Sequence, residues 1–370
     1  MKIGIITFHA SFNYGSMLQA YALQTFLERE GHDVEIINFR TAKQKSMYPK
    51  PIRFNNYGNV KQNIKRLLFE PNTILPLLKK WSLFDKFLHN RLKITKEYST
   101  VEELIQANFK YDLLITGSDQ IWNTDCGDFS EAYFGNFINS TIPKIAYAVS
   151  MGPHPETKDP EFYKSEVMNF KAISVREQRT KSFLENNGIC DNAQVVLDPT
   201  MLLEKEDYLN IINPKPLINK DYVFYYTPFG PNHKVLKEAA TIAKEKGLPI
   251  ICDNSYYVNA LKEYSNVIPY PAVGPEQFLN LIMNAKAVCG ESFHLMIFSI
   301  IFGKEFYCIN GDVDSRIQNL AKIAGFEDRM WSLRNKEKNY IHPYKKSLSN
   351  KLEVARTDSM RFLLNNIEGD

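Results

Sequence analysis

The sequence predicts an α/β protein with two Rossmann-like domains that face each other across a cleft. Apolar strands alternate with helices from residue 2 onward, a linker rich in Pro and Asn follows at 211–220, and a second alternating series then begins. Strands separated by helices form parallel sheets, and two separate series form two sheets. A chain of 370 residues is also longer than one ordinary hydrophobic core supports.

The first series defines a predicted N-terminal domain over residues 1–210. It opens with an apolar strand that leads through a polar loop into an apolar helix, which ends at Gly31. The later strands are short apolar runs bounded by polar residues, as expected for strands buried on both faces. We expect strands at 2–7, 34–37, 112–116, 144–149, 172–175 and 194–197, and helices around 16–30, 100–107 and 177–187.

The second series defines a predicted C-terminal domain over residues 221–345, followed by a C-terminal helix over 346–370. Its clearest helix begins with a proline at residue 275 and places Phe278, Leu281 and Ile282 on one face. We expect strands at 222–226, 249–252, 266–269, 286–289 and 305–309, and helices near 232–246, 275–285, 292–302 and 315–324.

A basic helical insertion at about 41–96 interrupts the first series. Between Arg40 and Lys96 there are 14 basic residues and only two acidic ones, although the whole chain has a net charge of only +3. Within a predicted helix at 74–92, apolar residues recur at helical spacing and several lysines lie off that stripe. Such a helix can lie on an anionic membrane, or it can pack its stripe on the N-terminal domain and leave its charges in water.

Composition narrows the class of protein. Hydrophobic residues make up 44% and charged residues 24% of the chain, as in ordinary globular proteins, and no apolar run is long enough to span a bilayer. The chain starts with a strand instead of a signal peptide, and its five cysteines show no metal-binding or disulfide spacing. We therefore expect a cytoplasmic protein with reduced thiols, no metal and no nucleic-acid partner.

The most informative segment is 117–123, with the sequence GSDQIWN, directly after the strand at 112–116. Ligands of open α/β proteins bind at the carboxyl ends of the strands. A glycine, short polar residues, an amide and an indole at that position suit a pocket for a sugar or a small anion. The plainer alternative is a turn in which Ser118 or Asp119 caps a helix and Trp122 packs in the core.

Four more polar segments follow predicted strands. The loop 9–15 precedes a helix, whose N-terminus attracts anions, although a plain polar connection is the alternative. Arg176 follows another strand and suits a carboxylate or phosphate, or else a salt bridge with Glu177 or a neighbour. Asp198-Pro199-Thr200 is typical of a structural cap. His294, in the first turn of an apolar helix, can meet an anion and transfer protons, or can be a core histidine.

Taken together, these motifs resemble the polysaccharide pyruvyl transferase family. The likeness runs in order from about residue 4 to residue 330 through the segments 13–15, 117–123, 174–177, 198–200 and 292–294, and includes Arg316 and the pair Asp328-Arg329. The resemblance implies a GT-B-like fold, with an acceptor domain followed by a donor domain. It also implies phosphoenolpyruvate as donor, a cyclic pyruvate ketal on two hydroxyls of a sugar as product, and no cofactor.

An active site for that reaction must bind the two anionic groups of the donor and transfer protons. These two requirements assign roles to the polar segments. The arginines and His294 suit the phosphate and carboxylate of the donor, and Asp119 or Glu291 suits the hydroxyl protons. The amides and Trp122 would hold and stack the sugar. The predicted catalytic residues are His294, Arg176, Asp119 and Glu291, and the predicted substrate-binding residues are Asn13, Tyr14, Gly15, Gly117, Ser118, Gln120, Trp122, Asn123, Ser292 and Arg316.

Two departures from the family pattern leave other functions open. Glu291 stands where the family usually has Asp, and Leu295 stands where it usually has Gly, so Leu295 is expected to narrow or redirect the pocket. One alternative is a GT-B-type nucleotide-sugar glycosyltransferase, in which Glu291 or Glu305 would bind the donor ribose. The other alternative is a non-catalytic sugar-binding protein.

Overall fold

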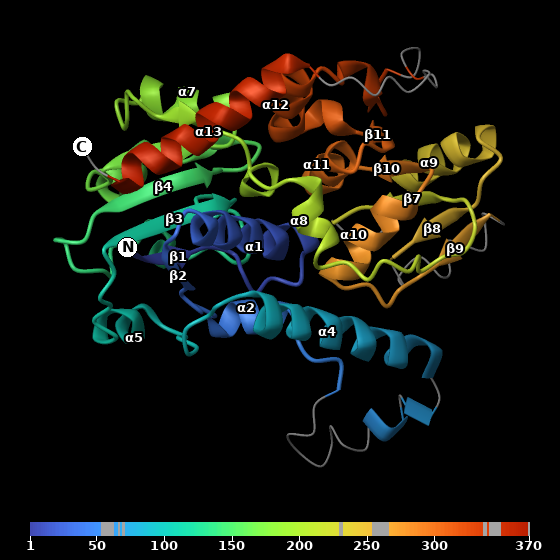
Figure 1. Cartoon of the computed structure of the whole chain (residues 1–370), viewed down its shortest axis with the longest axis horizontal. Coiled ribbons are helices and arrows are strands. Elements are labelled where there is room, and N and C mark those ends of the chain that lie inside the picture. The colour runs from blue at the N-terminus through green and yellow to red at the C-terminus, as the bar shows by residue number, and fades with distance from the viewer. Residues whose placement is uncertain are drawn as a thin grey trace.

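The chain forms two parallel six-stranded sheets, which lie side by side in Figure 1. The computed structural model describes residues 1–52, 63–65, 67–68, 71–228, 232–253, 266–335, 339 and 349–368. Parts of the predicted insertion and of the predicted second domain beyond residue 335 therefore lie outside the described residues. The prediction of two Rossmann-like sheets with helices is confirmed.

The first sheet has the strand order β2-β1-β3-β4-β5-β6. Its neighbours pair in parallel throughout, because a helix or a longer segment separates consecutive strands. The elements of this half are β1 (Lys2–Ile6), α1 (Tyr14–Arg29), β2 (Asp33–Ile36), α2 (Ala42–Met47), α4 (Pro71–Arg91), α5 (Val101–Gln106), β3 (Leu113–Asp119), η1 (Glu131–Phe134), β4 (Lys144–Val149), η2 (Pro155–Thr157), α6 (Pro160–Val167), β5 (Ala172–Val175), α7 (Gln178–Asn186), β6 (Gln194–Val195), η3 (Pro199–Met201) and α8 (Lys205–Leu209).

The second sheet has the order β12-β11-β10-β7-β8-β9 and is also parallel. Its last strand is only two residues long, which is too short for a sequence pattern to reveal it. The elements are β7 (Val223–Tyr226), α9 (His233–Glu245), β8 (Ile250–Cys252), β9 (Val267–Pro269), α10 (Pro275–Asn284), β10 (Ala287–Gly290), α11 (Phe293–Ile301), β11 (Glu305–Ile309), η6 (Gly311–Val313), α12 (Ser315–Ala324), η7 (Glu327–Arg329), β12 (Met330–Trp331) and α13 (Asn350–Glu368).

Each sheet has one point where the strand order changes direction. In the first sheet this point lies between β1 and β3, and in the second it lies between β7 and β10. Loops that leave neighbouring strands at such a point run to opposite faces of the sheet and open a crevice at the carboxyl edge. The chain therefore has two crevices available to form one site between its halves.

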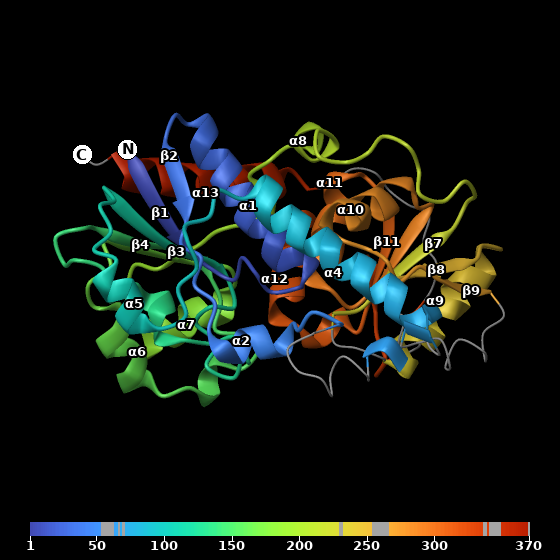
Figure 2. The same ribbon diagram turned by 90° about the horizontal axis from the view of Figure 1, so that it is seen from below.

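Helix α4 of the insertion packs against both halves, as Figure 2 shows where it crosses from α1 toward α10. Phe84 and Leu88 are buried in the main hydrophobic core. Leu83 meets Gly274 so closely that a Cβ at that glycine would lie 2.5 Å from the Leu83 Cβ, and Arg91 Nε lies 2.8 Å from Glu276 Oε1. Phe84 and Leu88 of the apolar stripe thus pack on protein, which is the second of the two arrangements considered for this helix, and contact of the insertion with a membrane stays a prediction.

The C-terminal helix α13 returns to the first sheet (Figure 1). Its Ser359 Oγ accepts a hydrogen bond of 2.8 Å from the backbone N–H of Leu197, and its Phe362 contacts the ring of Tyr147. Among the described helices, none has an apolar stretch of the length that a bilayer requires.

Candidate active site

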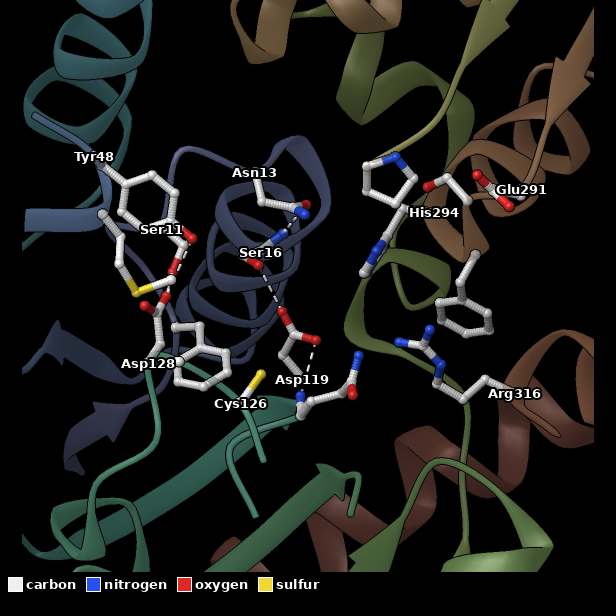
Figure 3. Close-up of a pocket in the computed structure, with 17 residues that line it drawn as sticks. Ser11, Asn13, Ser16, Tyr48, Asp119, Cys126, Asp128, Glu291, His294 and Arg316 are labelled. Atoms are coloured by element: carbon white, nitrogen blue, oxygen red, sulfur yellow. Dashed lines mark hydrogen bonds between the residues drawn. The ribbon is translucent and has the colours of Figure 1, made fainter. Parts of the chain in front are cut away.

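One pocket lies between the carboxyl edges of the two sheets and encloses about 180 Å³. Segments after β1 and β2 and around the end of β3 form one side, and segments after β7, β10 and β11 form the other, so the pocket joins the two crevices (Figure 3). Its lining residues are Phe8, Ser11, Asn13, Ser16, Met47, Tyr48, Asp119, Gln120, Cys126, Gly127, Asp128, Pro228, Glu291, Ser292, Phe293, His294 and Arg316.

The N-terminus of α1 forms the floor of one side. Asn13 is the N-cap, and its side chain accepts hydrogen bonds from the backbone N–H groups of Gly15 and Ser16. Ser16 Oγ then donates a 2.7 Å hydrogen bond to Asp119 Oδ2, which ties the helix start to the end of β3. The positive end of the α1 dipole therefore points toward the pocket.

His294 enters from the other half, on the first turn of α11. Ser292 caps that helix by accepting from the backbone N–H of Leu295, as expected for Ser before an apolar helix. The imidazole packs directly on Gly15, where any Cβ would overlap the ring. Gly15 is therefore required by the approach of the two halves and does not need to contact a ligand itself.

Behind His294 lies a buried cluster of opposite charges. Asp198 Oδ2 is 3.4 Å from His294 Nε2 and 2.9 Å from Arg176 Nη1, and Arg176 Nη2 is 3.4 Å from Asp119 Oδ1. Burial raises the carboxylate pKa values, but the nearby His294 and Arg176 outweigh this and leave the pKa values of both Asp119 and Asp198 below their usual range. Asp119 is thus an ionised carboxylate at the pocket surface.

Asp119 also has an unusual backbone. Its φ of 76° lies in the left-handed region that favours glycine, and for another residue this costs on the order of 1 kcal/mol or more. The hydrogen bond from Ser16 and the ion pair with Arg176 hold the side chain in place despite that cost. Strain of this kind is typical of functional sites.

Arg316 and Glu291 complete the second side. Arg316 begins α12 and donates two hydrogen bonds to Asp314, whose negative charge raises the pKa of the guanidinium although burial opposes this. Glu291 accepts hydrogen bonds from Thr227 at 2.5 Å and from Asn232 at 3.3 Å, so its carboxylate is held beside the pocket by neutral partners.

Most of the chain matches one known protein family. The family model described as Polysaccharide pyruvyl transferase matches residues 13–313, a span that includes every pocket residue after Ser11 apart from Arg316.

The chain belongs to the polysaccharide pyruvyl transferase family. It is therefore a transferase enzyme of polysaccharide modification. A search among curated proteins gives no match.

Solved structures show the same fold at low sequence identity. UDP-GlcNAc 2-epimerase from Methanocaldococcus jannaschii aligns with a TM-score of 0.55 and 15% identity over 100% of both chains. UDP-GlcNAc 2-epimerase from Neisseria meningitidis aligns with a TM-score of 0.52 and 10% identity, again over 100% of both chains. These likenesses concern the fold alone and support the GT-B-like class.

Seven predicted site residues line the pocket of this pyruvyl transferase family member. They come from four separate segments, which only the fold brings together. They are Asn13, Asp119, Gln120, Glu291, Ser292, His294 and Arg316.

Trp122 does not line it. The indole is 0% exposed and stacks on Phe134 with ring centroids 5.3 Å apart, so the predicted stacking of Trp122 on a sugar is wrong. Asn123 is bonded to Gln120, and the Ser118 hydroxyl donates to the Ala148 carbonyl. Gly117 has a φ of +124° and leaves no room for a Cβ beside the Tyr147 carbonyl. These four residues shape the β3 turn and do not line the pocket.

Tyr14, Arg176 and Leu295 also lie behind the surface. Tyr14 is 2% exposed and donates a 2.7 Å hydrogen bond to Asp253, and Arg176 is 3% exposed between its two aspartates. Leu295 is 0% exposed and lies beside Gly290. The expectation that Leu295 narrows the pocket is therefore wrong, because its side chain belongs to the core.

Several pocket residues could not be predicted from the sequence. Ser11, Tyr48 and Asp128 come from loops without a periodic pattern or a motif, and no local signal marks them. Ser16 directly follows the predicted segment 13–15, and its position at the N-terminus of the same helix is a sequence signal that could have identified it. Asp198 was interpreted as a structural cap, and it does cap Thr200, but its second oxygen also carries the ion pairs with Arg176 and His294.

Proposed function

We propose that this enzyme transfers pyruvate from phosphoenolpyruvate to two hydroxyls of a sugar and forms a pyruvate ketal on a polysaccharide or its precursor. The observation that supports this best is the convergence of three helix N-termini on one pocket. Helices α1, α11 and α12 have Asn13, Ser292 and Asp314 as their N-caps, and residues of each first turn line the pocket. Helix N-termini favour anions, and a donor with phosphate and carboxylate groups has two of them.

The charges at this end of the pocket suit the donor. His294 and Arg316 both line the pocket, and the charge of each can face a phosphate or a carboxylate. Arg176 is behind the surface, so we assign it a positioning role in which it fixes Asp119 and Asp198. This revises the interpretation of Arg176 as a direct anion clamp.

The proposed reaction converts one phosphoenolpyruvate and two hydroxyls into one ketal and one inorganic phosphate. The first hydroxyl oxygen adds to the carbon that bears the phosphate, and the methylene carbon gains a proton and becomes a methyl group. The second hydroxyl oxygen then displaces phosphate, so the two hydroxyl protons end on the methyl group and on phosphate. Asp119, ionised because of Arg176 and His294, accepts a hydroxyl proton, with Glu291 as the other carboxylate, and His294 donates to the leaving phosphate.

Ligand-induced stabilisation tests the donor. Phosphoenolpyruvate binds the folded state only, so a concentration of about 100 times Kd raises the free energy of unfolding by about 2.7 kcal/mol, and the melting temperature rises. His294→Ala should remove this rise, whereas His154→Ala, a control at an exposed histidine, should keep it. Nucleotide sugars that raise the melting temperature while phosphoenolpyruvate does not would instead indicate a glycosyltransferase.

Turnover needs a second measurement. Phosphate release from phosphoenolpyruvate in the presence of candidate glycans, with mass spectrometry of the products, should show a mass gain that corresponds to a ketal. Sugar binding without any phosphate release would indicate the non-catalytic alternative. Glu305 lies at the start of β11, bonded to Lys246 and Tyr307, on the opposite edge of the sheet from the pocket, so of the two candidate ribose ligands only Glu291 lines the site.

Location and membrane contact stay predictions. All five cysteines are free, which fits the proposed cytoplasmic location. Helix α4 exposes Lys79 and Lys86, and two lysines near an anionic leaflet contribute only about 2 kcal/mol, too little for stable anchoring. Sedimentation with anionic but not neutral vesicles, lost at high salt, would show that the remainder of the basic insertion supplies more.

A further inference from the structure

Three hydroxyl or carboxyl groups on the N-terminal side of the pocket form a continuous polar surface, which we call the hydroxyl wall: Ser11, Tyr48 and Asp128. Ser11 Oγ and Tyr48 Oη lie 2.5 Å and 3.4 Å from Asp128 Oδ2. Figure 3 shows the wall on the opposite side of Asp119 from His294, Glu291 and Arg316. None of the three residues is among the predicted site residues, and the family match assigns them no role.

The wall is unsuited to an anion. Among the described lining residues, His294 and Arg316 are the only basic ones, and both belong to the C-terminal side. Asp128 is 93% buried, since its exposed fraction is 7%, and its described hydrogen-bond partners are neutral: the hydroxyls of Ser11 and Tyr48 and the amide of Gln44. Burial raises the pKa of this carboxyl, the opposite direction to Asp119. A phosphate or carboxylate placed here would meet a carboxyl group and no cation.

The same wall matches the hydrogen bonding of a sugar. A sugar hydroxyl both donates and accepts, and the carboxyl oxygens and the two protein hydroxyls offer both functions at one place. The Tyr48 ring is fixed by stacking on Phe12, with centroids 5.8 Å apart and planes 24° apart. An aromatic ring beside hydroxyl-binding groups suits the mixed apolar and polar surface of a pyranose.

Tyr48 also connects the pocket with the insertion. It is the C-cap residue of α2, and α2 lies between β2 and β3, where the alternation of the Rossmann-like fold is interrupted. The inserted segment therefore contributes a side chain to the site itself, beyond packing on the outside of the domain.

We propose that the hydroxyl wall is the acceptor subsite, that it binds hydroxyls of a hexopyranose, and that the insertion selects the acceptor sugar through Tyr48. The identity of the second substrate as a sugar rests on the proposed function. Asp119 then lies between the acceptor at the wall and the anionic donor at His294 and Arg316, where it can accept a proton from a hydroxyl that points toward the donor.

Ligand-observed NMR with a panel of methyl hexopyranosides tests the wall without turnover. At least one glycoside should bind the wild type, and Asp128→Asn and Tyr48→Ala should each weaken it about tenfold or more, since hydrogen bonds to such groups are of that magnitude. Tyr48→Phe removes the hydroxyl and keeps the ring, so it separates their contributions to glycoside binding. Glu131→Gln, a change at an exposed carboxylate outside the pocket, is the matched control and should bind as the wild type does.

The donor serves as an internal reference. In both wall variants the rise in melting temperature caused by phosphoenolpyruvate should equal that of the wild type. The proposal is overturned if no glycoside of the panel binds the wild type, if both variants bind sugar normally, or if they lose the response to phosphoenolpyruvate instead. A wild type that binds a glycoside at the wall but never responds to phosphoenolpyruvate would contradict the proposed donor and leave the wall assignment supported.

Discussion

Gly15 is a residue at which the two halves of the enzyme meet directly. It stands in the first turn of α1, and the imidazole of His294 on α11 fills the space that a side chain would need. The backbone of Gly15 is not in the left-handed region, so steric contact alone requires glycine here. The position of His294 therefore depends on a residue that has no functional group.

We expect Gly15→Ala to displace His294 while leaving most of the fold intact. Displacement of a reacting group by about 1 Å can lower turnover about a hundredfold, so phosphate release should fall by about that factor. The double variant Gly15→Ala/His294→Ala should be no less active than His294→Ala alone, because both changes act on one group. Independent, multiplying losses would show that Gly15 acts elsewhere.

Arg176 provides a second residue-scale prediction, because its guanidinium lies between two buried carboxylates. Its removal deprives the buried carboxylates of Asp119 and Asp198 of the cation between them, which should lower the free energy of unfolding by about 3–5 kcal/mol. Arg179→Ala in the first turn of α7, where the side chain is 48% exposed, should cost less than about 0.5 kcal/mol.

The pH dependence of this loss follows from the aspartates. In the wild type the pKa of Asp198 is depressed on folding, so the unfolded state binds more protons below about pH 4, and the stabilisation is present above that pH and lost as the pH falls. The difference between wild type and Arg176→Ala should therefore be largest at neutral pH and shrink below about pH 4. Denaturant unfolding of both proteins at neutral pH and below about pH 4 measures this difference in the free energy of unfolding. A difference that grows on acidification would contradict the ion-pair explanation.

At the scale of elements, α4 connects the insertion with both halves of the protein. Phe84 stacks on Phe12 and Tyr14, and Tyr14 stacks on Phe278 of α10. Lys80 of α4 lies 3.4 Å from Asp253 at the end of β8. The sequence allowed this amphipathic helix to lie on a membrane or to pack on the protein, and in the structure it packs between the halves.

Phe84→Ala should be strongly destabilising, by about 3–5 kcal/mol, because it removes a fully buried ring from that packing. Leu75→Ala on the same helix is the control, since Leu75 is 56% exposed and should cost less than about 0.5 kcal/mol. Denaturant unfolding measures both. Equal, small effects would mean that α4 is not packed as described.

At the scale of the whole molecule, the order of elements along the chain differs from their order in space. Helix α13 follows the entire second sheet in sequence but packs on the first sheet, with Phe362 and Leu363 in the main core. Ser359 accepts from the Leu197 N–H, and the Leu197 carbonyl accepts from the Tyr147 hydroxyl at 3.0 Å. The loop that carries Asp198 is therefore held partly by the last helix.

We expect Ser359→Ala to lower the free energy of unfolding by about 1–3 kcal/mol, because a buried backbone N–H loses its acceptor. Thr357→Ala, at an exposed position of the same helix, should have a much smaller effect. Because Leu197 precedes Asp198, Ser359→Ala should also reduce the response to phosphoenolpyruvate. An unchanged stability would show that this hydrogen bond is replaced by water.

The sequence was sufficient to predict both sheets, because parallel strands buried on two faces leave continuous apolar runs that the helices separate. It was also sufficient to place Asp119 and His294 at the pocket, because polar residues directly after strands lie at the carboxyl edge. It could not distinguish Trp122 from its neighbours, since one residue of a turn can point into the core while the next lines a pocket. Tyr48 and Asp128 could not be predicted, because only long-range packing brings their loops together.

The return of α13 to the first sheet has a consequence for synthesis on the ribosome. Chain growth is vectorial, and domains that form N-terminal first usually complete their cores before the remainder emerges. Here the core of the first half is completed only when α13 packs on it. A nascent chain from which residues 1–210 have emerged therefore still lacks the Phe362 ring that packs on Tyr147 and the Ser359 hydroxyl that accepts from the Leu197 N–H. Emergence of α13, and not emergence of the first half, is the event that completes the packing around the loop behind His294.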